Sequence, residues 1–237
     1  MRYLISFLLT GFIAFTPVMA EQKAPVEFDN LYKARLYGFN LTVINRLTKI
    51  SDTEYDLLFK ADAMIGTVVE SSRMEWQPGK GAMRPLHYQY NRSGLGKKRK
   101  ADLLFNWQDN SVINKVDNSR WQMKIVENVQ DKLSYQVQMA QELSAGKKKF
   151  TYQIADGGEL KEYSFEVMGE EILETPLGKV NTLKVKRSRS NNKRVTYAWV
   201  APDWHYLLVR LQQEEGGKTN TIYITQAKID GKVITKF

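Results

Sequence analysis

The chain contains the stretch Glu54-Tyr55-Asp56-Leu57-Leu58-Phe59-Lys60-Ala61, and the pattern of this stretch indicates the class of the fold. Tyr55, Leu57, Phe59 and Ala61 are apolar or aromatic, and they alternate with mainly charged residues. Successive side chains of a strand point to opposite faces of a sheet. A period of two therefore indicates a strand with one buried face.

The same alternation returns later in the chain, in residues 194–199, 207–212 and 222–225. Turn-forming residues separate the alternating stretches at intervals typical of strands. Two of these turns, Asp156-Gly157 and Asn191-Asn192, suit tight hairpins whose backbone needs a positive φ. The pattern predicts a mainly β fold, with a strongly curved antiparallel sheet or an incomplete β-barrel.

One segment has a helical period instead. Apolar residues recur at spacings of three and four from Val129 to Leu143, which places them on one side of a helix. Asn128 is suited to cap the amino end, and Gly146 is suited to end the helix. We therefore expect one amphipathic helix over about 129–144, which covers an open face or end of the sheet.

The first twenty residues are typical of a signal peptide. Arg2 gives a positive start, an apolar stretch follows, and Val18-Met19-Ala20 supplies the small residues that a signal peptidase recognises. The apolar stretch is shorter than the ~20 residues of a membrane-spanning helix. We predict cleavage after Ala20, a periplasmic location, and a single β-rich domain over residues 21–237.

Composition restricts the chemistry and the partners. No cysteine occurs in the 237 residues, which excludes disulfides, thiol catalysis and thiolate metal sites. The formal net charge is +9, which in the cytoplasm favours a nucleic-acid partner. Export removes that partner and brings lipid head groups and acidic glycans instead. The expected partners are a lipid or an anionic envelope glycan, with peripheral membrane association and no nucleic acid.

Four stretches occur in a characteristic order along the chain. They are Arg84-Pro85-Leu86-His87-Tyr88, Gln130-Asp131-Lys132-Leu133-Ser134-Tyr135, residues 173–183 and residues 194–210. This combination resembles an exported bacterial family known as domain of unknown function 3108. The resemblance extends over essentially all of the chain after the leader. It implies an exported, β-rich envelope protein, and it brings neither a reaction nor catalytic residues.

Common catalytic patterns do not occur in the sequence. The two histidines, His87 and His205, have no metal-ligand spacing, and there is no Gly-x-Ser-x-Gly motif. His205 lies between Trp204 and Tyr206, which favours a packed aromatic cluster over a catalytic role. We therefore expect no enzyme activity, no catalytic residues, no metal and no cofactor.

Seven residues are predicted to contact a ligand. Asp131 and Ser134 lie three apart, so they either face a cleft between helix and sheet or serve the start of the helix. Basic residues cluster in residues 97–100, 147–149 and 184–194, where they either converge on one anion-binding face or protect sheet edges from pairing. Aromatic residues build a core or line a pocket for a lipid chain or a sugar face. The predicted ligand contacts are Asp131, Ser134, Lys184, Lys186, Arg187, Trp199 and Arg210.

Two functions are compatible with these features. The first is a non-enzymatic periplasmic binding or accessory protein of the cell envelope, which holds a lipid or another amphipathic anionic ligand between sheet and helix. The second is a structural or interaction protein that binds another envelope component through an exposed strand edge or a basic face. A transmembrane barrel fits less well, because charged residues interrupt both strand faces in residues 52–60 and 184–194.

Overall fold

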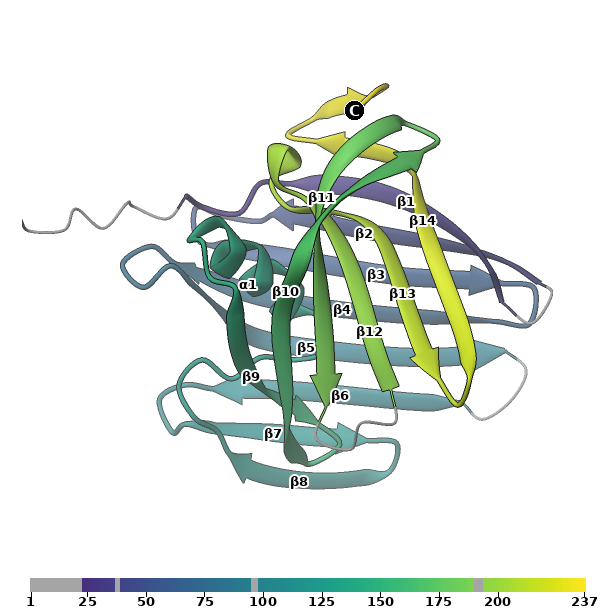
Figure 1. Cartoon of the computed structure of the whole chain (residues 1–237). Coiled ribbons are helices and arrows are strands. Elements are labelled where there is room, and N and C mark those ends of the chain that lie inside the picture. The colour runs from purple at the N-terminus through teal and green to yellow at the C-terminus, as the bar shows by residue number, and fades with distance from the viewer. Residues whose placement is uncertain (1–22, 37–38, 95–97, 190–193) are drawn as a thin grey trace, which may run out of the picture.

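The strands of this protein enter one antiparallel sheet almost in the order of the chain (Figure 1). The structure is a computed structural model, and it describes residues 23–36, 39–94, 98–189 and 194–237. The predicted leader, its cleavage site after Ala20, and the predicted Asn191-Asn192 turn lie outside the described residues.

The described residues before the helix form strands β1 to β8. Their bounds are β1 (Phe28–Leu36), β2 (Phe39–Lys49), β3 (Glu54–Ala63), β4 (Gly66–Gln77), β5 (Ala82–Gly94), β6 (Arg99–Asn106), β7 (Ser111–Val116) and β8 (Ser119–Lys124). The helix α1 (Ser134–Ser144) follows. The remaining elements are β9 (Lys149–Asp156), β10 (Glu159–Thr175), β11 (Gly178–Arg189), β12 (Arg194–Ala201), the 3-10 helix η1 (Pro202–Trp204), β13 (Leu207–Glu215), β14 (Lys218–Ile229) and β15 (Lys232–Ile234).

Pairing between β1 and β14 joins the two halves of the chain into one sheet. The strand order runs from β8 to β1 and then from β14 to β9, so β8 and β9 are the two ends. Within the described residues, these two ends do not pair with each other. The sheet therefore curls without closing into a barrel, as Figure 1 shows. This confirms the predicted fold class, a strongly curved antiparallel sheet with one helix.

Local irregularities of the strands explain part of the curvature. The pairing register shifts at four places, where one strand of a pair has an extra residue: Thr225 in β14, Leu86 in β5, Met168 in β10 and Val209 in β13. An extra residue in one strand of a pair bends that strand and increases its twist. The hairpin predicted at Asp156-Gly157 joins β9 to β10, and Gly157 and Gly158 have φ values of 67° and 85°.

The helix is shorter than predicted at its amino end. It begins at Ser134 rather than near residue 129. Asn128 has a φ of 63°, so it does not cap the helix. Gln130 forms a parallel bridge with Ile154 of β9, and this bridge uses backbone groups that a longer helix would need. Gln130 therefore lies at the edge of the sheet, and a turn at residues 132–133 leads into the helix.

The carboxyl end of the helix agrees with the prediction. Helix α1 ends at Ser144, and the backbone N–H of Gly146, at a φ of 79°, donates to the carbonyl of Leu143. In Figure 1, α1 lies inside the curl, between β4 and β5 on one side and the strands of the second half on the other. None of the described helices is long and apolar enough to span a membrane.

One contact between the two ends of the sheet involves a tryptophan and a glycine. The indole of Trp121 in β8 lies directly against Gly158 in the β9–β10 turn. A Cβ atom at Gly158 would come within 1.3 Å of Trp121 Nε1, so only glycine leaves room for the indole there. Because Gly158 has no side chain and adopts a positive φ, β8 can approach the β9–β10 hairpin.

Candidate functional site

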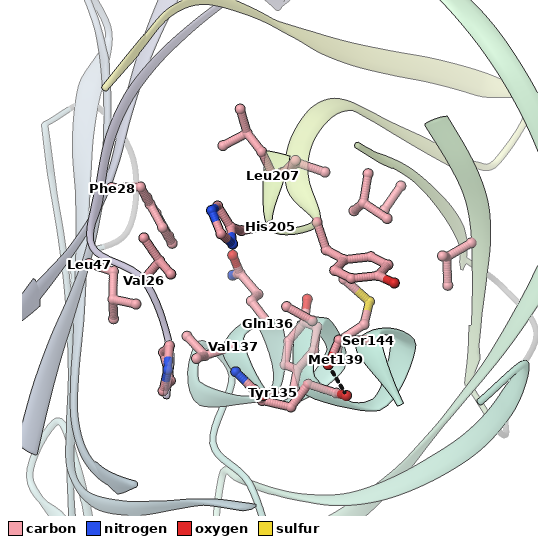
Figure 2. A pocket seen from close by; sticks show the side chains of 18 of the residues that line it. Val26, Phe28, Leu47, Tyr135, Gln136, Val137, Met139, Ser144, His205 and Leu207 are labelled. Atoms are coloured by element: carbon pink, nitrogen blue, oxygen red, sulfur yellow. Dashed lines mark hydrogen bonds between the residues drawn. The ribbon is translucent and has the colours of Figure 1, made fainter. Parts of the chain in front are cut away.

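A large cavity lies inside the curl of the sheet, and α1 forms one of its walls (Figure 2). Its volume is about 1110 Å³. This exceeds the roughly 300–1,000 Å³ of typical small-molecule pockets. The inner faces of β1, β2 and β11 to β14 supply the facing walls. Because side chains alternate along a strand, residues two apart, such as Phe28, Asn30 and Tyr32 of β1, line the cavity together.

The wall of the cavity is mainly apolar. Apolar side chains come from both halves of the sheet and from the helix, and Figure 2 shows several of them around the open space. Examples are Phe28, Leu47, Val137, Val185, Ala198 and Leu211. Their arrangement offers a ligand an apolar surface on several sides.

Exposed residues in the lining mark the mouth of the cavity. Lys23, Lys80 and Lys147 lie there, from three separate parts of the chain, together with His205. Lys80 forms an ion pair with Glu127, and Lys147 forms one with a glutamate of α1. The mouth therefore has positive groups from three parts of the chain, and one of them, Lys147, follows the carboxyl end of the helix.

Arg187 lines the cavity, whereas no aspartate or glutamate of the described residues does. Its guanidinium donates to the hydroxyl groups of Tyr135 and Thr196, the latter at 2.9 Å. It also lies near the rings of Tyr135 and Tyr163. Among the described residues, no carboxylate forms an ion pair with Arg187, and the guanidinium of Arg189 lies over the same Tyr163 ring. A guanidinium in this setting is suited to bind a carboxylate or phosphate.

Two asparagines add a polar patch to the apolar wall. Asn30 of β1 and Asn45 of β2 are direct partners in the sheet, and both line the cavity. They are 1% and 5% exposed. The side-chain amide of Asn45 donates to Gln136 Oε1 at 3.4 Å, but Asn30 Oδ1 and Asn45 Oδ1 have no partner among the described groups.

The predicted pair Asp131 and Ser134 lies outside the cavity lining, at the start of α1. Asp131 is fully buried. Its Oδ1 accepts from the backbone N–H groups of Leu133 and Ser134 at 2.7 and 2.8 Å, and its Oδ2 accepts from Ser72 at 2.6 Å. Ser134 Oγ accepts from the backbone N–H of Asp131 at 2.9 Å. The pair therefore serves the helix start, which was one of its two predicted roles.

Burial raises the pKa of Asp131, and the hydrogen bonds from Ser72 and from the helix start oppose this shift. The neighbouring residue Gln130 donates from its side-chain amide to the carbonyl of Met83 in β5 at 2.9 Å. The segment from Gln130 to Ser134 thus holds the amino end of α1 against β4, β5 and β9.

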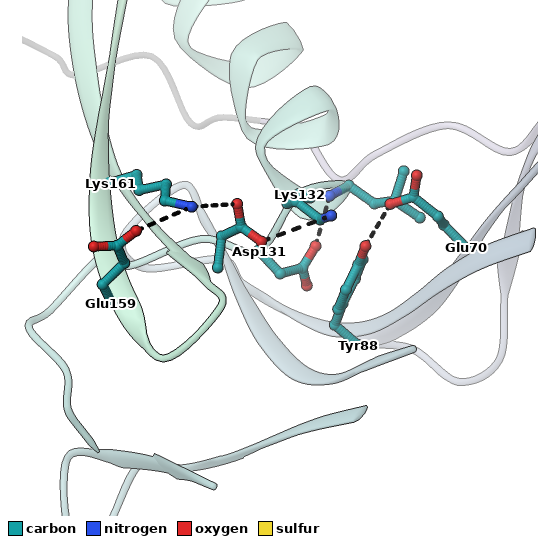
Figure 3. A network of polar contacts seen from close by, with 8 residues as sticks. Glu70, Tyr88, Asp131, Lys132, Glu159 and Lys161 are labelled. Atoms are coloured by element: carbon teal, nitrogen blue, oxygen red, sulfur yellow. Dashed lines mark hydrogen bonds and ion pairs between the residues drawn. The ribbon is translucent and has the colours of Figure 1, made fainter. Parts of the chain in front are cut away.

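A network of charged groups lies beside this helix start (Figure 3). Lys132 is 3.7 Å from a carboxylate oxygen of Asp156, and Lys161 is 2.9 Å from the other. Tyr88 donates to Glu70, whose pKa is raised by burial. Burial alone raises the pKa of Asp156, but the nearby cationic groups of Lys132 and Lys161 lower it overall.

The pocket at this network has a volume of only about 60 Å³. That space holds a few water molecules and is too small for a lipid or a sugar. We therefore regard the network as a structural seal at the amino end of α1.

Four of the predicted contacts lie on the outer face of the sheet. Lys184, Trp199 and Arg210 are direct neighbours on β11, β12 and β13. Lys186 lies on the same side of β11 as Lys184, opposite Val185, because side chains alternate along the strand. Arg210 lies 4.2 Å from the centre of the Trp199 ring, and Lys184 lies 5.0 Å from it.

A carboxylate completes this outer row. Glu171 accepts from Trp199 Nε1 at 2.6 Å and pairs with Lys184 at 3.1 Å. These contacts hold the pKa of Glu171 below its ordinary value. Trp199 is only 2% exposed, so its ring has no free face for a sugar. The row stabilises the outer surface and lies on the opposite side of the sheet from the cavity.

The structure thus divides the seven predicted residues into three places. Arg187 lines the cavity, two lie at the helix start and four lie on the outer face. The basic clusters do not converge on one face, since Lys147 lies at the mouth, Arg187 inside, and Lys184 and Lys186 outside. Within the described residues, no group of His, Cys, Asp and Glu side chains has the arrangement of a metal site.

Comparison with known proteins assigns the chain to a family. The family model described as "Protein of unknown function (DUF3108)" matches residues 64–225. The chain belongs to this family. The DUF3108 match confirms the resemblance, over a shorter range than the whole chain after the leader. It includes α1, Arg187 and the outer row, whereas Asn30 and Asn45 precede it.

A solved structure supports the fold of this DUF3108 protein. A β-barrel-like protein of domain of unknown function DUF1849 from Brucella abortus has a TM-score of 0.58 and 10% identity, over 86% of this chain and 98% of the other. A chain described as a candidate lipoprotein from Parabacteroides distasonis has 12% identity, over 85% of this chain and 95% of the other, with a TM-score of 0.32. Among curated proteins, none matches the chain.

Proposed function

We propose that this protein is a non-enzymatic binding or accessory protein of the cell envelope, located in the periplasm after removal of its leader. In this proposal the cavity between sheet and helix holds an amphipathic anionic ligand, such as a lipid with one or more acyl chains. The anionic group pairs with Arg187, and the apolar part fills the remaining cavity.

The observation that carries this proposal is the large apolar cavity with an arginine in its wall and no lining carboxylate among the described residues. Each methylene group that leaves water stabilises a complex by about 0.8 kcal/mol. An acyl chain therefore gains several kcal/mol from a wall of this kind. Arg187 donates to the neutral hydroxyl groups of Tyr135 and Thr196. A bound anion would give its guanidinium a charged partner.

The lysines at the mouth support the same ligand class. Lys23, Lys80 and Lys147 surround the opening and attract anions over a distance of about 10 Å at moderate salt. A neutral or cationic ligand would gain nothing from this arrangement. An anionic lipid gains a faster approach to the cavity.

Mass spectrometry of the purified protein tests the proposal directly. The protein is purified from the periplasmic fraction, its mass is measured under native conditions, and bound molecules are extracted with organic solvent. We expect a bound molecule that contains an acyl chain and an acidic group. A protein that carries no lipid, and that does not bind a fluorescent fatty acid after delipidation, contradicts the proposal.

A pair of variants locates the anionic group. Arg187→Gln removes the charge inside the cavity, while Lys186→Gln removes the same charge from the outer face of the same strand. We expect Arg187→Gln to weaken binding of a fatty acid about tenfold, which is typical for loss of a charge-assisted hydrogen bond. Lys186→Gln should bind as the unchanged protein does. Equal binding by all three proteins would remove Arg187 from the proposed site.

A second candidate function rests on the open edge of the sheet. Strand β8 pairs on one side with β7, and its other edge has no strand partner among the described residues. Such an edge is suited to accept a strand from another envelope protein. Crosslinking from a photoreactive amino acid at Arg120 in intact cells, with Arg46 as the control position, tests this alternative. A crosslinked partner specific to Arg120 supports it, and no crosslink at either position contradicts it.

A further inference from the structure

We infer that the cavity has a second, hydrogen-bonding subsite at Asn30, Asn45 and Gln136, which selects a ligand whose acyl chain carries a hydroxyl group. This inference rests on the proposed function and adds the chemical class of the chain. The subsite differs from the Arg187 site because it consists of neutral amides on β1, β2 and α1.

The first observation is the pairing of the two asparagines. Asn30 and Asn45 are opposite each other in adjacent antiparallel strands, so their side chains lie side by side on the inner face. Each lies in the middle of an apolar row, with Phe28 and Tyr32 around Asn30. A polar residue inside such a row is costly unless its groups form hydrogen bonds.

The second observation is that two acceptors in this patch lack partners. Asn30 Oδ1 and Asn45 Oδ1 are buried, and no described group donates to either. Gln136 uses its Oε1 to accept from Asn45. Nearly all buried carbonyl oxygens in proteins have a donor. Asn30 Nδ2, a donor, also lacks a partner among the described groups. A ligand hydroxyl in the cavity is in a position to donate to one of the two acceptors and to accept from Asn30 Nδ2.

The third observation places the subsite near the proposed anion site. Tyr135, which accepts from Arg187, and Gln136, which accepts from Asn45, are consecutive residues in the first turn of α1. One ligand can therefore reach both places with its acidic end and a nearby part of its chain. A hydroxyl close to the acid group meets both requirements, since it donates to an asparagine while the acid pairs with Arg187.

Three probes of the same chain length test the inference on the delipidated full chain. They are hexadecanoate, 3-hydroxyhexadecanoate and 3-methoxyhexadecanoate, each measured by displacement of a fluorescent fatty acid. A buried hydrogen bond corresponds to about a tenfold difference in affinity. We therefore expect the hydroxy acid to bind about ten times more tightly than the other two. The methoxy acid has the same oxygen but no donor, so it separates donation from size.

Substitutions then test which asparagine accepts the hydrogen bond from the hydroxyl group of the ligand. Asn45→Leu and Asn30→Leu should reduce the preference for the hydroxy acid while hexadecanoate still binds. Asn114→Leu is the matched control, because Asn114 is also a buried asparagine of the sheet but does not line the cavity. It should leave the preference unchanged. If a variant does not fold, the three probes on the unchanged protein still decide the inference.

The outcomes separate this inference from the proposed function. If all three acids bind equally, ordered water satisfies the asparagines and the inference is wrong, although the proposed function stands. If none binds, both are wrong. If the preference persists in Asn45→Leu and in Asn30→Leu, the subsite lies elsewhere and the assignment to these residues is wrong.

Discussion

The two ends of helix α1 differ in what surrounds them. At the amino end, Asp131 is buried and accepts three hydrogen bonds, and the adjacent pocket is only about 60 Å³. At the carboxyl end, the helix faces the mouth of a cavity of about 1110 Å³. We call these the sealed end and the open end. The difference indicates that the buried groups around Asp131 hold the fold together, while the cavity, which extends from Tyr135 in the first turn to the mouth at the open end, is available for a ligand.

This comparison predicts that substitutions at the sealed end change stability, whereas substitutions at the open end change binding. Asp131→Ala should have the largest effect. It leaves the backbone N–H groups of Leu133 and Ser134 and the hydroxyl of Ser72 without an acceptor in a buried place. We expect a loss of about 3 kcal/mol in the free energy of unfolding, measured by urea denaturation.

The control for this variant lies at the other end of the helix. Ser144 donates to the carbonyl of Gln141 at 2.8 Å and is exposed. Ser144→Ala should change the free energy of unfolding by less than about 0.5 kcal/mol. Similar losses for the two variants would show that the two ends of α1 do not differ in the way we infer.

The contact between β8 and the β9–β10 turn predicts the next largest effect. Gly158→Ala forces the Trp121 indole away and places alanine at a φ of 85°. We expect a loss of about 2 kcal/mol in the free energy of unfolding, because strain and lost packing add. The shift of Trp121 should also change the near-ultraviolet circular dichroism.

Gly157→Ala provides a matched control for the strain alone. Gly157 has a φ of 67°, but its Cβ would only approach Lys161 Nζ at 4.0 Å. It should therefore lose about 1 kcal/mol from backbone strain, with no change in the tryptophan signal. If the two variants lose the same stability, Trp121 contributes nothing to holding the ends of the sheet together.

The pH dependence of stability gives a smaller effect at the sealed end. Burial raises the pKa of Glu70 above its ordinary value of 4.5, so the folded state holds this proton more tightly than the unfolded state does. The stability that this provides is complete below pH 4.5 and is lost as the pH rises through the folded-state pKa.

Glu70→Gln removes this titration and keeps an acceptor for Tyr88. The melting temperature of the unchanged protein should therefore rise relative to that of the variant as the pH falls from 7 toward 4.5. The other carboxylates titrate in both proteins, so their contributions cancel in the difference. Parallel melting curves over this range would contradict a raised pKa at Glu70.

The sequence predicts the sealed end and the open end with unequal success. Alternation in residues 54–61 and 194–212 is local, so it predicts the strands and the curved sheet. The motif at Asp131 and Ser134 predicts a helix start, because side-chain to backbone bonds within four residues need no distant partner. The helix boundary is wrong at residue 129, since the bridge from Gln130 to β9 depends on a pairing distant in the chain.

The cavity is harder to predict because it depends on which face of each strand points inward. Lys184, Trp199 and Arg210 have the chemistry of ligand contacts, but the register places them on the outer face. Local alternation alone does not indicate Asn30 and Asn45 as site residues. Their signal was present, since each interrupts an apolar row at the inward-facing position of a strand, but only the pairing of β1 with β2 brings them together.

The smallest expected effect on stability is at the open end of α1, where a substitution should change ligand association instead. Lys147→Gln removes one positive group from the mouth, where exposed ion pairs contribute little to folding. Its free energy of unfolding should change by less than about 0.5 kcal/mol. Association of a fluorescent fatty acid, measured by stopped flow at low salt, should slow about twofold because the lysine attracts the anion.

Two comparisons isolate this electrostatic contribution at the mouth. The difference between Lys147→Gln and the unchanged protein should disappear at about 0.5 M salt, where charges are screened within a few ångströms. Lys149→Gln removes the same charge nearby but outside the cavity lining, so its association rate should match that of the unchanged protein. If Lys147→Gln destabilises the fold without slowing association, the mouth is structural, and the contrast between the two ends of α1 does not separate folding from binding.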